Sequence, residues 1–145
     1  MLLRLALIVG TCAAFTGVGI TWSVLRVEYP TFLLITNRDD FPPIHQFQEA
    51  RIIEFFPVLF LNLVATLSLF WLAPADQRIW VGVAMLALLM ILGWSIGVQI
   101  PTHSLLDKSG FNHELVTKMV RNEWVRFFAV ILQAFGYSAL LFKNL

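Results

Sequence analysis

Four long stretches without a charged side chain constrain the fold of this sequence more than any other feature. No Asp, Glu, Lys or Arg occurs within residues 5–25, 55–75, 79–106 or 127–142. A helix needs about 20 apolar residues, each rising about 1.5 Å, to cross the roughly 30 Å hydrocarbon core of a bilayer. The four stretches therefore predict four transmembrane helices, of which the fourth is about one turn shorter than a full span.

The composition indicates a membrane protein and excludes several function classes. Of the 145 residues, 59% are hydrophobic and 13% are charged, against about 45–50% and about 25% in a soluble domain. The net charge of +1 suggests no basic surface, so we expect no nucleic-acid partner. A single cysteine, Cys12, permits neither an intramolecular disulfide nor a cysteine-based metal site.

Helix-starting and helix-ending residues divide the chain into four helices within one domain, residues 1–145. Pro42 and Pro43 suit the first turn of the second helix, and Asn112 is a suitable N-cap for the fourth. Pro101 is expected to bend or end the third helix. We expect helices at roughly residues 2–26, 40–72, 77–100 and 112–142, with a kinked continuation of the first helix past Pro30 as an alternative.

The expected fold is an all-α four-helix transmembrane bundle. The second and fourth helices would each have about 30 residues and a length of about 45 Å, so both would extend beyond the bilayer on one side. The side with the longer connections carries most of the Lys and Arg, and the positive-inside rule places that side in the cytoplasm. We expect a multi-pass protein of the plasma or inner membrane, surrounded by the lipid bilayer, with a homo-oligomer as an open alternative.

The polar residues of the third and fourth helices are expected to point into the bundle. A helix turns about 100° per residue, which places Asn122, Arg126 and Gln133 on one stripe of the fourth helix. Gln133 lies in the middle of the membrane and should face protein, so the other two should face the bundle as well. Gln99 and His103 follow each other by one turn on the third helix.

The first and second helices add polar groups at the same end of the bundle. Arg51 and Asn62 are nearly eclipsed on the second helix, and Glu54 lies about 60° away. Trp22 and Glu28 come near the end of the first helix. All four helices therefore bring polar side chains to one membrane interface.

This convergence predicts a polar pocket whose central interaction joins Arg126 to Glu54 or Glu28. The floor would consist of three amide side chains, Asn62, Gln99 and Gln133. Further candidates for contact with a bound molecule are Arg51, Trp22 and Trp124. The alternative is a structural ion-pair network that locks the helices together.

The histidines raise the alternative of a metal site. His45 and Glu49 are four residues apart, which is metal-ligand spacing on one helical face, and His103 approaches from another helix. Such ligands suit zinc, copper or non-haem iron. However, His45 and Glu49 lie about 120–160° around the helix from Arg51 and do not share its inward stripe. We therefore expect no metal and no cofactor, keep His45 and Glu49 as the candidate ligands, and assign His103 as a base near pH 7.

Short motifs along nearly the whole chain resemble a large group of small four-helix bacterial membrane proteins related to the anthrone oxygenase-like family. The resembling segments are TWSVLRVEYP (21–30), IHQFQEARI (44–52), VQIPTHSLL (98–106) and RNEWVRFF (121–128), together with Pro57 and Asn62. In that group a Gln-x-Pro-x-His element ends the third helix and an Asn-x-Trp-x-Arg element opens the fourth. The corresponding residues here are Gln99, Pro101 and His103, and Asn122, Trp124 and Arg126.

The resemblance implies chemistry on a lipophilic small molecule, because the best-known activity of the family is cofactor-independent oxygenation of anthrones to quinones. We expect a membrane-embedded enzyme of the oxygenase, cyclase or isomerase type. His103, Glu54 or Glu28 would move a proton, while Arg126 and Asn122 would stabilise a developing enolate or phenolate. The alternative is a non-enzymatic ligand-binding or structural subunit of a membrane complex. A pocket of about 300 Å³ or more beside Arg126 would favour a ligand site, and a filled core would favour the structural role.

Overall fold

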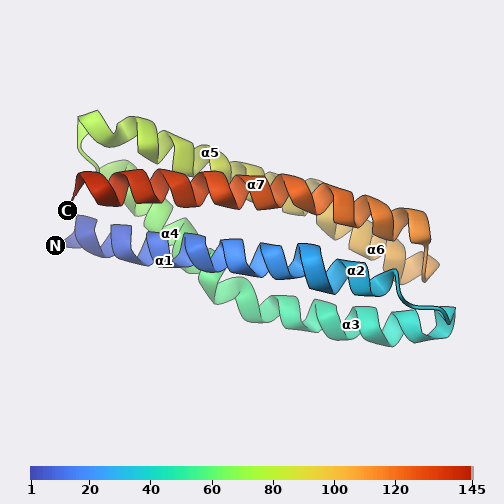
Figure 1. Ribbon diagram of the computed structural model, residues 1–145. Helices are drawn as coiled ribbons and strands as arrows, with labels where there is room; N and C mark the ends of the chain where they lie inside the picture. The colour runs from blue at the N-terminus through green and yellow to red at the C-terminus, as the bar shows by residue number, and fades with distance from the viewer. Residues whose placement is uncertain (145) are drawn as a thin grey trace.

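The computed structural model describes residues 1–144, which fold into four helical rods joined by short loops (Figure 1). The first rod contains α1 (Leu2–Ser23), η1 (Val24–Glu28) and α2 (Tyr29–Phe32). The second contains η2 (Arg38–Asp40), α3 (Phe41–Ile52), η3 (Ile53–Phe55) and α4 (Phe56–Leu72). The third contains η4 (Ala75–Gln77), α5 (Arg78–Trp94), η5 (Ser95–Gln99) and α6 (Ile100–Ser109), and the fourth is α7 (His113–Lys143). The last residue of the expected domain, Leu145, lies outside the described part.

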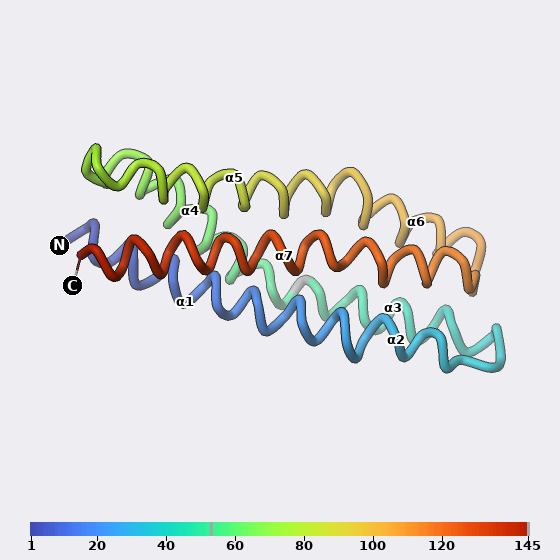
Figure 2. The backbone as a smooth tube through the Cα atoms, turned by 45° about the horizontal axis from the view of Figure 1, so that its top comes forward, coloured from blue at the N-terminus to red at the C-terminus, as the bar shows by residue number. Residues whose placement is uncertain are grey.

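Successive rods run in opposite directions, so the two chain ends lie together at one end of the bundle (Figure 1). The loops 33–37 and 110–112 lie at the other end, which we call the loop end. α7 packs along both α5 and α1, and α1 also packs along α4. Figure 2 shows α7 running between α5 and α1. The predicted all-α four-helix bundle is confirmed.

All four rods are long and apolar enough to cross a membrane, which indicates a membrane protein. They span Leu2–Phe32, Arg38–Leu72, Ala75–Ser109 and His113–Lys143, with 31, 35, 35 and 31 residues. Large apolar side chains cover the surface, as at Trp71 and Phe128, which are 82% and 61% exposed. The second and fourth rods are not exceptional in length, since the first and third are equally long.

The first and third rods continue beyond residues 26 and 100, because Pro30 and Pro101 bend the helix instead of ending it. Each proline lies two residues beyond a π-helical segment, η1 or η5. A proline has no N–H to donate, and its ring clashes with a carbonyl of the preceding helical turn. A wider π turn at that point accommodates the ring and lets the helix resume. The residues after these segments, which include Tyr29 and His103, therefore belong to continuous rods.

The second rod changes its helical phase halfway along. The 3-10 segment η3 separates α3 from α4, and Pro57 follows in the first turn of α4. Three residues at about 120° each, in place of about 100°, rotate the preceding helix face by about 60°. The angle between α3 and α4 is visible in Figure 1. Faces computed from α4 therefore do not carry over to α3.

Small residues and one buried tyrosine bring α7 close to its neighbours. At Gly136 a Cβ atom would lie 3.3 Å from the backbone of both Trp80 and Ala84 on α5, a close approach that only a small residue permits. Tyr137 is fully buried, and its ring occupies the space beside Gly10 of α1. Its hydroxyl is 2.8 Å from the hydroxyl of Thr66 on α4. One ring thus joins α7 to both α1 and α4.

Substituting Gly10→Ala should destabilise the bundle, because the new Cβ would overlap the ring of Tyr137. Overpacking of this kind costs about 1–3 kcal/mol. Gly19→Ala on the same helix is the matched control, since a Cβ there meets nothing within 4 Å. The control should be neutral or stabilising by up to about 1 kcal/mol. Thermal unfolding in detergent measures the difference, and equal midpoints for the two variants would contradict the packing described.

Candidate functional site

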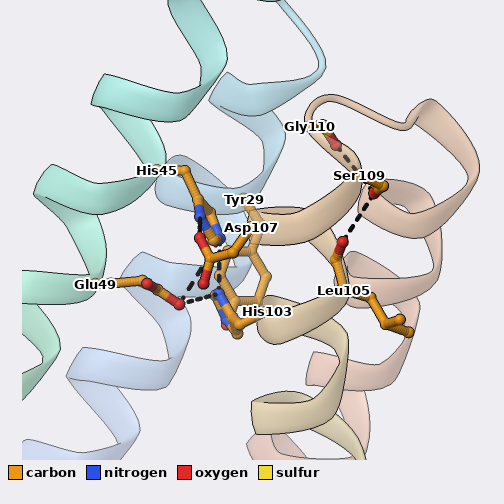
Figure 3. Close-up of polar contacts among 8 residues, drawn as sticks. All are labelled: Tyr29, His45, Glu49, His103, Leu105, Asp107, Ser109 and Gly110. Carbon is orange, nitrogen blue, oxygen red and sulfur yellow. Dashed lines mark hydrogen bonds and ion pairs between the residues drawn. The ribbon is translucent and has the colours of Figure 1, made fainter.

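Five polar side chains from three helices meet near the loop end of the bundle (Figure 3). We call them the histidine cluster, and they are Tyr29 of α2, His45 and Glu49 of α3, and His103 and Asp107 of α6. Each histidine lies four residues before the acid on its own helix, so histidine and acid share a helical face. On the first and third rods, the π segments η1 and η5 lie just before the cluster residues.

Three ring and carboxylate atoms point into one small space at the centre of the cluster. His45 Nε2 lies 2.9 Å from His103 Nδ1. The Glu49 Oε1 atom is 3.3 Å from His103 Nδ1 and 4.0 Å from His45 Nε2. The two imidazole rings lie nearly parallel, with centroids 5.1 Å apart. This triangle of two nitrogens and one oxygen is the part of the cluster that can bind an ion or transfer a proton.

The outer nitrogen of each ring also has a partner, and these partners orient the rings. His45 Nδ1 is 3.0 Å from Asp107 Oδ1, and His103 Nε2 is 3.0 Å from the Tyr29 hydroxyl. An ionised carboxylate only accepts hydrogen bonds, so His45 Nδ1 donates and His45 Nε2 presents a lone pair to His103. With a proton between the rings, Tyr29, His103, His45 and Asp107 form one continuous chain of hydrogen bonds.

Burial within the cluster is graded from the rings to the carboxylates. His45 is 1% exposed and His103 is 12% exposed, whereas Glu49 and Asp107 are 34% and 43% exposed. The His45 ring stacks on Phe41, with centroids 5.1 Å apart. The rings are therefore shielded, and the two carboxylates connect them to the surroundings of the bundle.

The cluster brings together His103, His45 and Glu49, of which only His103 was expected to face inward. The prediction that Arg51 shares the inner stripe is wrong, because Arg51 is 59% exposed and pairs at the surface with Glu54 at 3.2 Å. The phase change at η3 explains both errors, since it turns His45 inward and Arg51 outward. The two His-x-x-x-acid spacings were the sequence signal for this site.

Arg126 pairs with Glu123 and not with Glu54 or Glu28, which corrects the predicted central interaction. Arg126 Nη1 is 3.4 Å from Glu123 Oε2, and Glu123 is fully buried. Gln99 Nε2 donates to the same carboxylate oxygen at 2.8 Å. Glu123 lies three residues before Arg126 on the same helix, a spacing at which side chains meet. That spacing could have identified the partner from the sequence.

The amides of Asn62 and Gln133 bond to each other and do not form the floor of a shared open pocket with Gln99. Asn62 Nδ2 donates to Gln133 Oε1 at 2.9 Å, and Gln133 Nε2 donates to Asn62 Oδ1 at 3.0 Å. Thr66 also donates to Asn62 Oδ1, at 3.2 Å. Gln133 is fully buried. At this level of the bundle, the polar side chains therefore hydrogen-bond to one another.

The other predicted site residues lie apart from the cluster's contacts. Trp124 lines a half-open groove of about 290 Å³ together with Leu25, Arg26, Pro30 and Val120. Trp22, which is 47% exposed, packs on Phe127 and lies under the guanidinium of Arg26. Within residues 1–144, the side chains of Glu28 and Asn122 form no hydrogen bond or ion pair with the cluster.

Comparisons with known proteins do not place this chain in a family. No protein-family model, curated protein or solved structure matches it. The resemblance to the anthrone oxygenase-like family therefore stays a prediction.

Removing Arg126 should destabilise the fold strongly, because Glu123 would remain buried without a counter-charge. Arg126→Ala is expected to cost about 3–5 kcal/mol, the usual effect of breaking a buried pair. Adding Glu123→Gln should recover much of this loss by removing the orphaned charge. Arg121→Ala, at an exposed position of the same helix, is the control and should have little effect. Denaturant unfolding in detergent tests this, and a double variant less stable than Arg126→Ala alone would contradict it.

Proposed function

We propose that the protein is a membrane-embedded enzyme that acts on a lipophilic small molecule by acid–base chemistry at the histidine cluster. The observation that carries this proposal is the convergence of His45, His103 and Glu49 on one space. Ionisable groups inside a transmembrane bundle are expensive to bury and usually mark a functional site. The cluster also joins buried rings to partly exposed carboxylates, which a purely structural contact does not require.

The hydrogen-bond chain supports a proton-transfer role. Neutral imidazole is a suitable base near pH 7. A proton taken up by the His45–His103 pair would lie between Glu49 on one side and Asp107 on the other, so its charge would be balanced. Asp107 is 43% exposed and is the natural exit for that proton. A cofactor-independent oxygenase, a cyclase and an isomerase all need this step.

The position of the cluster supports a substrate that enters from the bilayer. Rods of 31 and 35 residues measure about 46–52 Å against a hydrocarbon core of roughly 30 Å. The excess length would project on the loop end and place the cluster at the membrane interface of the plasma or inner membrane. The groove beside Trp124, at about 290 Å³, is slightly smaller than the predicted pocket, and neither Arg126 nor a cluster residue is among its lining residues.

A second candidate is a non-enzymatic ligand-binding or structural subunit of a membrane complex. The observation in its favour is that Asn62 and Gln133, like Arg126 and Glu123, are bonded to other residues of the bundle. These contacts join two helices or two turns of one helix, and a structural role would explain them. The histidine cluster is the part of the molecule on which the two candidates differ.

Turnover of an unknown lipophilic substrate can be tested without naming it. Protein in lipid nanodiscs would be incubated with a lipid extract of its source cells, and mass spectrometry would follow every species. We expect a compound that wild type consumes and that His103→Ala consumes about 100-fold or more slowly, the usual range for a lost acid–base group. His113→Ala, which removes the exposed histidine outside the cluster, should behave as wild type.

Two outcomes would contradict the enzymatic proposal. One is equal consumption by wild type and a folded His103→Ala variant. The other is no consumption by wild type under any condition in which it remains folded, which would move the structural candidate to first place.

A further inference from the structure

We propose that the histidine cluster is a binding site for one divalent transition-metal ion, held by His45 Nε2, His103 Nδ1 and the Glu49 carboxylate. The inference rests on the site of the proposed function but changes its chemistry, because a bound metal ion would occupy the two ring nitrogens. Water on that ion, and not the His45–His103 pair, would then exchange the proton. Metal binding can be tested separately from turnover. The inference also departs from the sequence-based expectation that no metal is bound. The three ligands come from two helices, α3 and α6, so a bound ion would connect these helices.

The geometry of the triangle fits a metal ion with small adjustments. Zinc binds imidazole nitrogen and carboxylate oxygen at about 2.0–2.2 Å, so ligand atoms around a tetrahedral ion lie about 3.3–3.6 Å apart. The three observed separations are 2.9, 3.3 and 4.0 Å. The shortest would have to open and the longest to close by roughly half an ångström. Side-chain rotations of Glu49 and His103 suffice for such changes.

The outer hydrogen bonds orient both rings as metal ligands need. A metal-binding histidine usually donates its other N–H to a carboxylate or another acceptor, which fixes its tautomer. Asp107 accepts from His45 Nδ1, which leaves the lone pair of Nε2 pointing into the triangle. The Tyr29 oxygen can accept from His103 Nε2 in the same way, which frees Nδ1. In the other tautomer His103 Nδ1 carries the proton that bonds to His45 Nε2, 2.9 Å away, and a metal ion would replace that proton.

The charge of the cluster also favours a cation. Glu49 and Asp107 are two carboxylates beside two imidazoles, and each carboxylate's ion pairs within residues 1–144 are to histidine alone. Within residues 1–144, no Lys or Arg forms an ion pair with either carboxylate. A divalent ion would balance both carboxylates at once, one as a direct ligand and the other through the His45 ring.

The ligand set selects a class of metal. Two imidazoles and one carboxylate suit Zn²⁺, Fe²⁺ and Co²⁺, while Mg²⁺ and Ca²⁺ prefer ligands that are all oxygen. Three protein ligands leave at least one coordination position open, as in catalytic zinc and non-haem iron sites. Because Glu49 is 34% exposed and His45 only 1%, the open position would face the Glu49 side. A substrate or water can reach that side.

The test is a titration of untagged, chelator-treated protein in detergent with Co²⁺, whose visible absorption reports nitrogen and oxygen coordination. Wild type should bind about one Co²⁺ per chain at this site, and Zn²⁺ should displace it. Zn²⁺ should also raise the unfolding temperature, because a ligand that binds only the folded state stabilises it. His113→Ala should match wild type in both measurements.

The variants are chosen so that loss of binding is not confused with loss of fold. His45 is packed against Phe41, so substitutions are made at Glu49 and His103 instead. Glu49→Gln keeps the size of a partly exposed side chain and should abolish the Co²⁺ spectrum without unfolding the protein. Asp107→Asn should weaken binding about 10–100-fold, as expected for a residue that orients a ligand.

Each outcome separates the metal inference from the proposed enzymatic function. The metal inference is overturned if folded wild type binds no Co²⁺ or Zn²⁺, or if Glu49→Gln and His103→Ala both bind as wild type does. Turnover that depends on His103 but not on added metal would leave the acid–base proposal standing alone. Site-specific metal binding without any turnover would support this inference and contradict the enzymatic one.

Discussion

A polar side chain inside an apolar bundle must find its partner within the protein, and this constraint organises the molecule along its length. Near the middle, Asn62 and Gln133 satisfy each other. Towards the loop end, Glu123 holds Arg126. Beyond that, His45 and His103 join α3 to α6. This last contact adds to the packing of Phe41 on Phe32 and Phe111, and together they hold α3 against the rest of the bundle.

The fold was predictable because it depends on charge-free stretches and helix caps, which tertiary packing does not alter. Four charge-free stretches gave four rods, and Asn112 caps α7 as expected, accepting from the Leu115 N–H at 3.1 Å. The sequence left open whether Pro30 and Pro101 bend or end their helices, and in the structure a π turn accommodates each proline. Proline usually signals a helix end, and nothing in the flanking sequence shows that the helix continues.

The site was only partly predictable, and the reason is local. An ideal helix through the second rod puts Arg51 inside and His45 outside, whereas η3 and Pro57 reverse this. His103 was identified because its helix face runs on from Gln99, which is buried. Glu123 was not predicted as the partner of Arg126, because the predicted partners, Glu54 and Glu28, lie on other helices. Spacing of three or four residues, in Glu123–Arg126 and in both His-x-x-x-acid pairs, proved the better guide.

The central proposal is that His45, His103 and Glu49 together hold one metal ion. X-ray absorption spectroscopy of the zinc-loaded protein tests it most directly. The account predicts nitrogen and oxygen ligands at about 2.0–2.2 Å, with the outer-shell scattering of two imidazole rings, and loss of one ring's scattering in His103→Ala. A zinc spectrum with oxygen ligands alone, unchanged in that variant, would contradict it.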